Sequence, residues 1–549
     1  MTSQQLRPTS VRRAWVVTLI VTGLLASACS SAGVTPTQPA RSALLATGQP
    51  APSASAESGG IATPGASAEP GASALPDPGA ATALLIAKAI DAVKADPTNQ
   101  ESLLELGLAY YQHARETADP TDYARADESF DRILAIDPTN ADAIIGKGTL
   151  ALAKHQFAAA LAFGQHAQTL SPKASRVYGV IGDALTELGR YPEAIDAVQT
   201  MVDTRPDLSS YSRVSYQREL HGDLEGATSM MEEAVIAGGP ATENTEYLRV
   251  ILGNLWFARG DLDKAEASYA ASLEHSPGYV FALAGEARVA AAKGDLATSI
   301  SLYQEAEDRV PFPEFLIAQG EAQEAAGLTD DAAKTYRLVR DIEGYFASNG
   351  VNTDLDLALF ESDHGDPVTA LRLARAAYAE TPNIKAADAL AWALYHNGQL
   401  AEARQRAQEA LRLGTLDPSY FYHAGIIAVA QADDAMARYW LGQSLVRNPM
   451  WSPLHAPRAA AALAELGSGP VATAPPVATI APAVSSAPAV SSAPAVSSAP
   501  AVSSAPAVSS APAVSSAPAV SSAPADLPSA AASAAVSPSM AATSSAAAP

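Results

Sequence analysis

Residues 260–277 read GDLDKAEASYAASLEHSP, and the same pattern recurs through the middle of the chain. It begins with a Gly-Asp pair, carries a small residue at Ala265 and an aromatic residue at Tyr269, and ends in proline. Weaker copies recur about every 34 residues, from GRYPEAIDAVQTMVDTRP at 189–206 to GQLAEARQRAQEALRLGT at 398–415. Such a period indicates a solenoid of stacked units, because no unit can bury its apolar face without a neighbour.

A small residue at one position of each copy fixes a register of ten helix pairs. These residues are Ala126, Ala160, Ala194, Ala227, Ala265, Ser299, Ala332, Ala370, Ala403 and Ala437. Proline follows most of them by twelve residues and ends the second helix of a pair, because it lacks an amide hydrogen and clashes with the preceding turn. The pairs Gly260-Asp261 and Gly365-Asp366 are predicted to end the first helix on a left-handed glycine and to cap the second helix.

This pattern resembles that of the tetratricopeptide repeat family over roughly residues 98–450. The resemblance implies an all-α fold, an α-α superhelix of about ten helix pairs that exceeds one full turn. A lone helix from about Ala81 to Asp96 is predicted before the ten pairs, and a final helix at about 452–466 after them. We expect an insertion between the helices of the first pair, around 113–125, and short extensions near 239–245 and 344–351.

Composition divides the chain into a signal peptide at 1–28, a spacer at 29–80, the solenoid at 81–467 and a tail at 468–549. Ala, Ser, Pro, Gly and Thr dominate the spacer and the tail, and the tail repeats APAVSS seven times between 481 and 522. Both are predicted to be disordered, because their apolar surface cannot offset the entropy of ordering. We interpret the tail as a spacer expanded by replication slippage; wall penetration, O-linked glycosylation and adhesion are alternatives.

The N-terminus has the pattern of an export signal. Arg7, Arg12 and Arg13 precede an uncharged stretch at 14–28 that is shorter than the roughly 20 residues of a spanning helix. Residues 25–29, LASAC, resemble the lipobox of bacterial lipoproteins, which implies lipid attachment at Cys29, the only cysteine of the chain. Secretory cleavage at the same bond and an uncleaved anchor are the alternatives. The expected location is the cell envelope, lipid-anchored to the outer face of the membrane, or the secreted fraction.

The net charge of -23 lies on the middle of the chain, because four acidic and four basic residues balance outside it. Such a surface repels nucleic acid and anionic lipid and favours a basic or neutral partner, although the charge also keeps a long solenoid soluble. None of the nine histidines has the helical i, i+4 spacing with glutamate of a zinc site. With no acid-base constellation either, we expect no enzyme, no metal and no cofactor.

In the repeat family the first helices line a concave groove, and the resemblance places certain positions in it. Carried onto this register, they are Tyr111, Asp183, Glu187, Tyr216, Glu219, Tyr247, Asn254, Phe257, Glu321, Glu324, Trp392, Tyr395 and Tyr422. They lack the Lys-Asn-Asn-Lys-Arg clamp by which chaperone adaptors of the family grip a C-terminal carboxylate. Carboxylates and aromatic rings suit an extended peptide that is basic or aromatic, whereas packing between helices is the alternative for each aromatic residue.

These features favour a non-catalytic interaction scaffold of the bacterial cell envelope that binds a protein or an extended peptide. An accessory subunit of envelope polysaccharide, cell-wall or secretion machinery is one alternative. A glycan- or solute-binding protein is the other.

Overall fold

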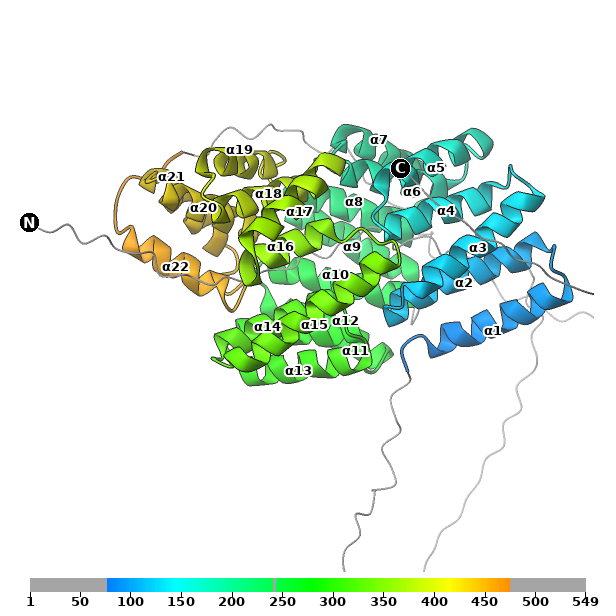
Figure 1. Ribbon diagram of the computed structural model, residues 1–549, viewed down its shortest axis with the longest axis horizontal. Helices are drawn as coiled ribbons and strands as arrows, with labels where there is room; N and C mark the ends of the chain where they lie inside the picture. Colours follow the sequence, from blue (N-terminus) through cyan, green and yellow to red (C-terminus); the bar gives the residue numbers. More distant parts are fainter. Residues whose placement is uncertain (1–76, 240–242, 474–549) are drawn as a thin grey trace, which may run out of the picture. The chain divides into compact units, whose positions relative to one another are not determined.

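The computed structural model describes residues 77–239 and 243–473, and within these ranges helices are the regular elements (Figure 1). They are α1 (Ala80–Ala95), α2 (Gln100–Thr117), α3 (Thr121–Ile136), α4 (Ala141–Ala153), α5 (Phe157–Leu170), α6 (Ser175–Glu187), α7 (Tyr191–Thr204), α8 (Leu208–Leu220), α9 (Leu224–Gly238), α10 (Glu243–Ala258), α11 (Leu262–His275), α12 (Val280–Ala292), α13 (Leu296–Arg309), α14 (Pro313–Ala325), α15 (Thr329–Ser348), α16 (Asp354–His364), α17 (Pro367–Glu380), α18 (Ile384–His396), α19 (Leu400–Ala410), α20 (Pro418–Ala430), α21 (Asp434–Leu445) and α22 (His455–Glu465). The lone helices α1 and α22 flank ten pairs, from α2/α3 to α20/α21, which confirms the predicted register.

Small and large residues alternate at the pair interfaces as the register requires. Ala265 and Tyr269 of α11 are fully buried. A Cβ atom on Gly253 of α10, or on Gly285 of α12, would collide with the ring of Tyr269. One aromatic ring therefore fills the space left by two glycines, one in its own pair and one in the next, and joins neighbouring repeats at interior packing density.

The predicted side-chain caps are present at both Gly-Asp pairs, since Asp366 also caps its helix by accepting from the backbone N–H of Thr369 at 2.9 Å, but the left-handed glycine is found at only one of them. Asp261 accepts a hydrogen bond from the backbone N–H of Lys264 at 3.2 Å, and Gly260 before it has a left-handed φ of 81°. Gly365 differs, because its φ is -139°. There the carboxylate of Glu361 accepts a hydrogen bond from the backbone N–H of Asp366 at 2.9 Å, so a side chain closes the turn that we had assigned to a left-handed glycine.

The expected insertions are absorbed mostly into helices. In the first pair α2 continues to Thr117 and α3 begins at Thr121, so the insertion that we placed between these helices instead lengthens them. Asp122 of α3 binds the ring of His113 at 2.6 Å and ties the two long ends together. The extension near 344–351 likewise prolongs α15 to 20 residues. The extension near 239–245 falls partly outside the described residues.

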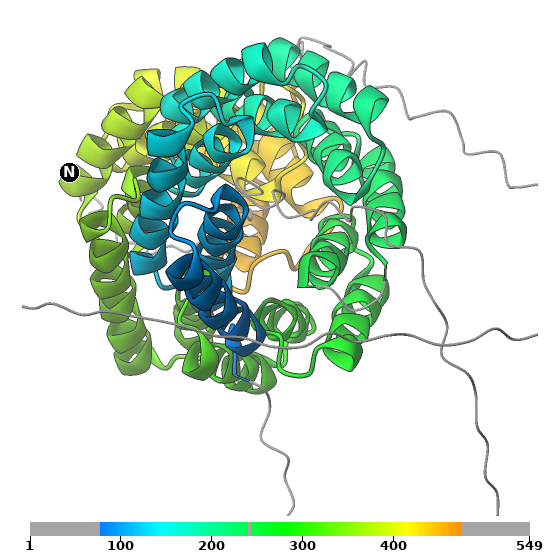
Figure 2. The same cartoon turned by 90° about the vertical axis from the view of Figure 1, so that its right-hand side faces the viewer.

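The helix pairs wind around an axis for more than one turn (Figure 2), and hydrogen bonds join one turn to the next. His155 bonds the carbonyl oxygen of Asn352, 197 residues later, at 2.8 Å. The side-chain amide of Asn448 donates to the carbonyl oxygen of Phe257, 191 residues earlier, at 3.1 Å. At about 34 residues per repeat these separations are between five and six repeats. One turn of the superhelix therefore stacks directly on the next.

The glycine that ends a first helix takes part in this stacking. A Cβ atom on Gly260 would collide with the backbone carbonyl of Arg447, and Gly189 and Gly222 meet the backbone at Pro382 and Gly414 in the same way. Each of these glycines thus faces the loop that follows a second helix one turn later. The Gly-Asp start of the repeat therefore joins turns as well as the helices of one pair.

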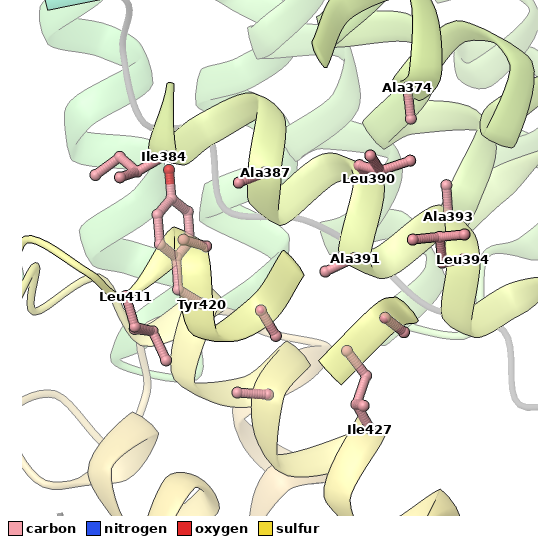
Figure 3. Packing of buried hydrophobic residues seen from close by; sticks show 14 of the residues in the cluster. Ala374, Ile384, Ala387, Leu390, Ala391, Ala393, Leu394, Leu411, Tyr420 and Ile427 are labelled. Atoms are coloured by element: carbon pink, nitrogen blue, oxygen red, sulfur yellow. The ribbon is translucent and has the colours of Figure 1, made fainter. Parts of the chain in front are cut away.

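The largest apolar cluster is shared between two turns. It joins Tyr191 of α7 and Tyr216 of α8 to buried residues of α16 through α21. Figure 3 shows the part around α18, with the ring of Tyr420 beside Ile384. Hydrophobic burial therefore stabilises contacts between turns as well as between neighbouring repeats. In the described ranges, none of the helices has the length and apolar character needed to cross a membrane.

Candidate functional site

Three neighbouring cavities lie in the described part of the superhelix, and we call them the first, second and third. Their volumes are about 290, 100 and 70 Å³. Lys385 and Tyr420 line both the first and the second, whereas Asn254 and Arg288 line both the second and the third. The walls come mainly from the first helices of the pairs, which is the face where the resemblance placed a groove.

Aromatic rings form much of the first cavity. Tyr247 and Phe281 meet edge to face with ring centroids 5.3 Å apart, and Phe312 lies 5.0 Å from Phe281. Tyr111 and Phe346 also line it. The hydroxyl of Tyr111 is buried and has no hydrogen-bond partner within the described part of the chain. The cavity thus combines apolar walls with an unsatisfied polar group.

The cations of the first cavity each have a carboxylate of their own. Arg115 pairs with Glu243 at 3.4 Å, and Lys385 lies 3.5 Å from Glu187. Asp388, which also lines the cavity, is bound by the ring of His423 at 2.9 Å.

Three further carboxylates, those of Glu314, Glu343 and Asp356, line the same cavity. None of them forms an ion pair in residues 77–239 and 243–473. Burial raises the pKa of Glu314 to about 7, and the nearby Asp356 adds to the effect. Burial also holds the pKa of Glu343 well above its ordinary value, with Asp356 and Glu314 adding to it. Burial therefore favours the protonated, neutral form of these carboxyl groups, and none of them has an ion-pair partner among the described residues to stabilise its charge.

The second cavity contains four of the residues predicted for the groove, Tyr216, Glu219, Asn254 and Phe257. Burial raises the pKa of Glu219 to about 7, and Asp417 acts in the same direction. The hydroxyl of Tyr269 donates to Asn254 at 2.7 Å, which fixes this amide beside the cavity.

The other predicted groove residues divide between the cavities and the packed interior. Tyr111 and Tyr247 line the first cavity, and Glu321 lines the third. Six more line none of the three cavities: Asp183, Glu187, Glu324, Trp392, Tyr395 and Tyr422. Trp392 and Tyr422 are buried in an apolar cluster with Trp451. The groove assignment of these residues remains a prediction.

Several of the six are held by neighbours that the sequence did not reveal. Arg213 donates two hydrogen bonds to Asp183, at 2.8 and 2.7 Å, and Arg458 lies 3.3 Å from Glu324. Glu187 accepts from the hydroxyl of Tyr216 at 3.2 Å. These partners lie on the next helix pair or farther along the chain, so the register of a single repeat could not place them.

The register also missed the carboxylates of the first cavity. Glu343 lies on the prolonged end of α15, a second helix, and Asp356 lies in the first turn of α16. The only feature of the sequence that pointed to Glu343 and Asp356 was the longer spacing between the two repeats that contain them. Among the described residues no group of three or more His, Cys, Asp or Glu side chains could hold a metal ion.

The family model described as tetratricopeptide repeat matches residues 145–209 and 285–344. Tetratricopeptide repeat protein 1 of Schizosaccharomyces pombe is 26% identical over 157 residues, which are 27% of this chain and 14% of that protein. The match thus spans well under two thirds of that relative's length.

Among solved structures, a thermophilic TPR protein of Thermus thermophilus is 21% identical, with a TM-score of 0.30, over 38% of this chain and 98% of that one. A tetratricopeptide repeat protein of Parabacteroides merdae is 17% identical, with a TM-score of 0.30, over 48% of this chain and 99% of that one. These are similarities between this chain and those proteins.

Proposed function

Because this chain contains tetratricopeptide repeats, a fold of protein-interaction scaffolds, we propose that it is a non-catalytic scaffold of the bacterial cell envelope. In this proposal it holds a partner protein through an extended segment that is basic or aromatic. The segment binds in the interior of the superhelix, where carboxylates and aromatic rings both line the cavities.

One observation carries the proposal, namely the second cavity. Its lining joins Glu219 to the aromatic rings of Tyr216 and Phe257, all on first helices, and it also contains Asp417 and the cations Arg288, Lys385 and Arg447. Aromatic anchors supply contact area, and the carboxylate of Glu219 can pair with a basic residue of the bound segment. The net charge of -23 acts in the same direction at longer range.

Attachment to the envelope is the second part of the proposal. It rests on Cys29, which lies outside the described residues, and on the export pattern before it. Replacement of Cys29 by Ala is expected to release the protein from the membrane fraction of fractionated cells. Membrane association that persists in the Cys29→Ala protein would contradict lipid anchoring.

Photocrosslinking in cells tests the scaffold itself. A photoreactive amino acid placed at Glu219, inside, is expected to capture a protein whose crosslinked segment is rich in Lys, Arg or aromatic residues. The matched control places it at Glu232, which is exposed on α9. Equal capture from both positions, or a captured segment rich in Asp and Glu, would contradict the proposal.

A further inference from the structure

The three carboxylates of the first cavity point to a ligand of their own, apart from the partner segment proposed for the second cavity. We propose that the first cavity binds a small organic cation, a primary ammonium group on an apolar body about the size of one or two rings. This is a separate small-molecule site, and it does not depend on the scaffold function.

The volume sets the size of the ligand. A protein cavity of about 150 Å³ lined by apolar residues holds benzene, and ligand pockets commonly begin at about 300 Å³. The first cavity, at about 290 Å³, therefore has room for a ring and a short amine chain. Its Tyr247 and Phe281 rings suit an apolar body and attract a cation through their π-faces.

The charges set the sign of the ligand. Arg115 and Lys385 already face one carboxylate each, Glu243 at 3.4 Å and Glu187 at 3.5 Å, although the Nζ atom of Lys385 makes no hydrogen bond in the described ranges. Glu314, Glu343 and Asp356 come from three successive helices, α14, α15 and α16, and lack ion pairs within the described ranges. A bound ammonium group would be the counter-ion of these carboxyl groups in their ionised form.

A further observation concerns hydrogen bonding. An ammonium group carries three N–H donors. The buried hydroxyl of Tyr111, which has no partner in the described ranges, lies in the same lining and can accept one of those donors.

The site should couple ligand binding to proton release. Glu314 shares the cavity with Glu343, Asp356 and Asp388, and with the cationic or titratable Arg115, His155 and Lys385, besides its tyrosines. Burial raises the pKa of Glu314 to about 7, so this carboxyl group is partly protonated at neutral pH when no ligand is bound. A bound ammonium group stabilises the ionised carboxylates and expels those protons, so the affinity should rise with pH through about 7.

Calorimetric titration of the full chain with phenethylamine tests this site, with phenethyl alcohol as the uncharged match. We expect the amine to bind at least tenfold more tightly than the alcohol, and to release protons, seen as a binding heat that depends on the buffer. The Glu314→Gln, Glu343→Gln double variant should lose at least tenfold in amine affinity and keep its affinity for the alcohol. Glu232→Gln, on the outer surface of α9, should change neither.

The proposal is overturned if amine and alcohol bind equally, or if phenethylamine, tryptamine and cyclohexylmethylamine all give no binding. It is also overturned if the double variant binds the amine as the wild type does. Should the double variant fail to fold, as judged by circular dichroism, the buffer dependence of the wild-type titration decides, because binding without proton release contradicts the site. The crosslinking experiment at Glu219 tests the scaffold proposal independently. A negative amine titration therefore counts against the small-molecule site and not against the scaffold.

Discussion

Asn383 donates a hydrogen bond from its side-chain amide to the backbone carbonyl oxygen of Glu187, 196 residues earlier, at 2.8 Å. The oxygen of the same side chain accepts from the backbone N–H of Ala386 at 2.8 Å and caps α18. Asn383 is 2% exposed. One buried side chain thus starts a helix and joins two turns of the superhelix.

Replacement of Asn383 by Ala should cost more than the loss of a cap. A lost cap costs about 1 kcal/mol, and the buried carbonyl of Glu187 left without its donor adds about 1–3 kcal/mol. The matched control is Asn99→Ala, because Asn99 caps α2 at an exposed position by accepting from Ser102. Urea unfolding monitored by circular dichroism measures both; equal losses would mean that the contact between turns adds nothing.

Gly260→Ala tests the same stacking through backbone sterics. Gly260 has a φ of 81°, and an added Cβ would meet the carbonyl of Arg447. Gly294 has a φ of 83° with nothing near its Cβ position, so Gly294→Ala carries the left-handed strain alone, about 1–2 kcal/mol. We expect Gly260→Ala to lower the melting temperature clearly further, since overpacking adds about 1–3 kcal/mol. Identical shifts in the two variants would contradict contact between the turns.

The buried pair of Arg213 and Asp183 joins two neighbouring repeats. Both side chains are less than a tenth exposed. Arg213→Met should destabilise by about 3–5 kcal/mol, because it leaves a buried carboxylate without its partner, and Asp183→Leu added to it should recover much of the loss. Unfolding of the two single variants and the double variant gives the coupling. A double variant as unstable as the sum of the singles would contradict a direct pairing.

Stability should depend on pH through the first cavity. The pKa of Glu314 rises from an ordinary 4.5 to about 7 in the folded chain, so the folded state binds a proton that the unfolded state releases. The stability from this group is complete below about pH 4.5 and is lost as the pH rises through about 7. Glu314→Gln should therefore melt higher than the wild type at pH 8 and close to it at pH 4. A difference that is the same at both pH values would contradict the shift.

The sequence predicted the parts of the fold that each repeat encodes by itself. The burial of Ala265 and Tyr269 and the cap at Asp261 follow from spacing within one unit, and the structure confirms them. The left-handed conformation that we predicted for Gly365 was wrong. The carboxylate of Glu361 closes this turn instead, and nothing in the Gly-Asp pair indicates that side chain.

Contacts between turns could not be read from the repeat, because nothing in one unit states which unit lies above it. The link from Asn383 to Glu187 depends on how far each pair rotates against the next, and small rotations accumulate over five to six repeats. The same limit applies to the candidate site. Glu219 and Phe257 were found through their register, whereas Glu314 and Glu343 meet only because the interior closes around them.

Peptide binding to the purified chain tests the central claim most directly. Fluorescence anisotropy would compare labelled basic–aromatic peptides with acidic peptides of equal length at about pH 8, where Glu219 is ionised because its pKa is about 7. We expect the basic peptides to bind, more weakly as salt is added, and Glu219→Lys to weaken them at least tenfold while Glu232→Lys does not. Acidic peptides that bind as well as the basic ones, or equal losses in both variants, would contradict an acidic interior that holds a basic partner.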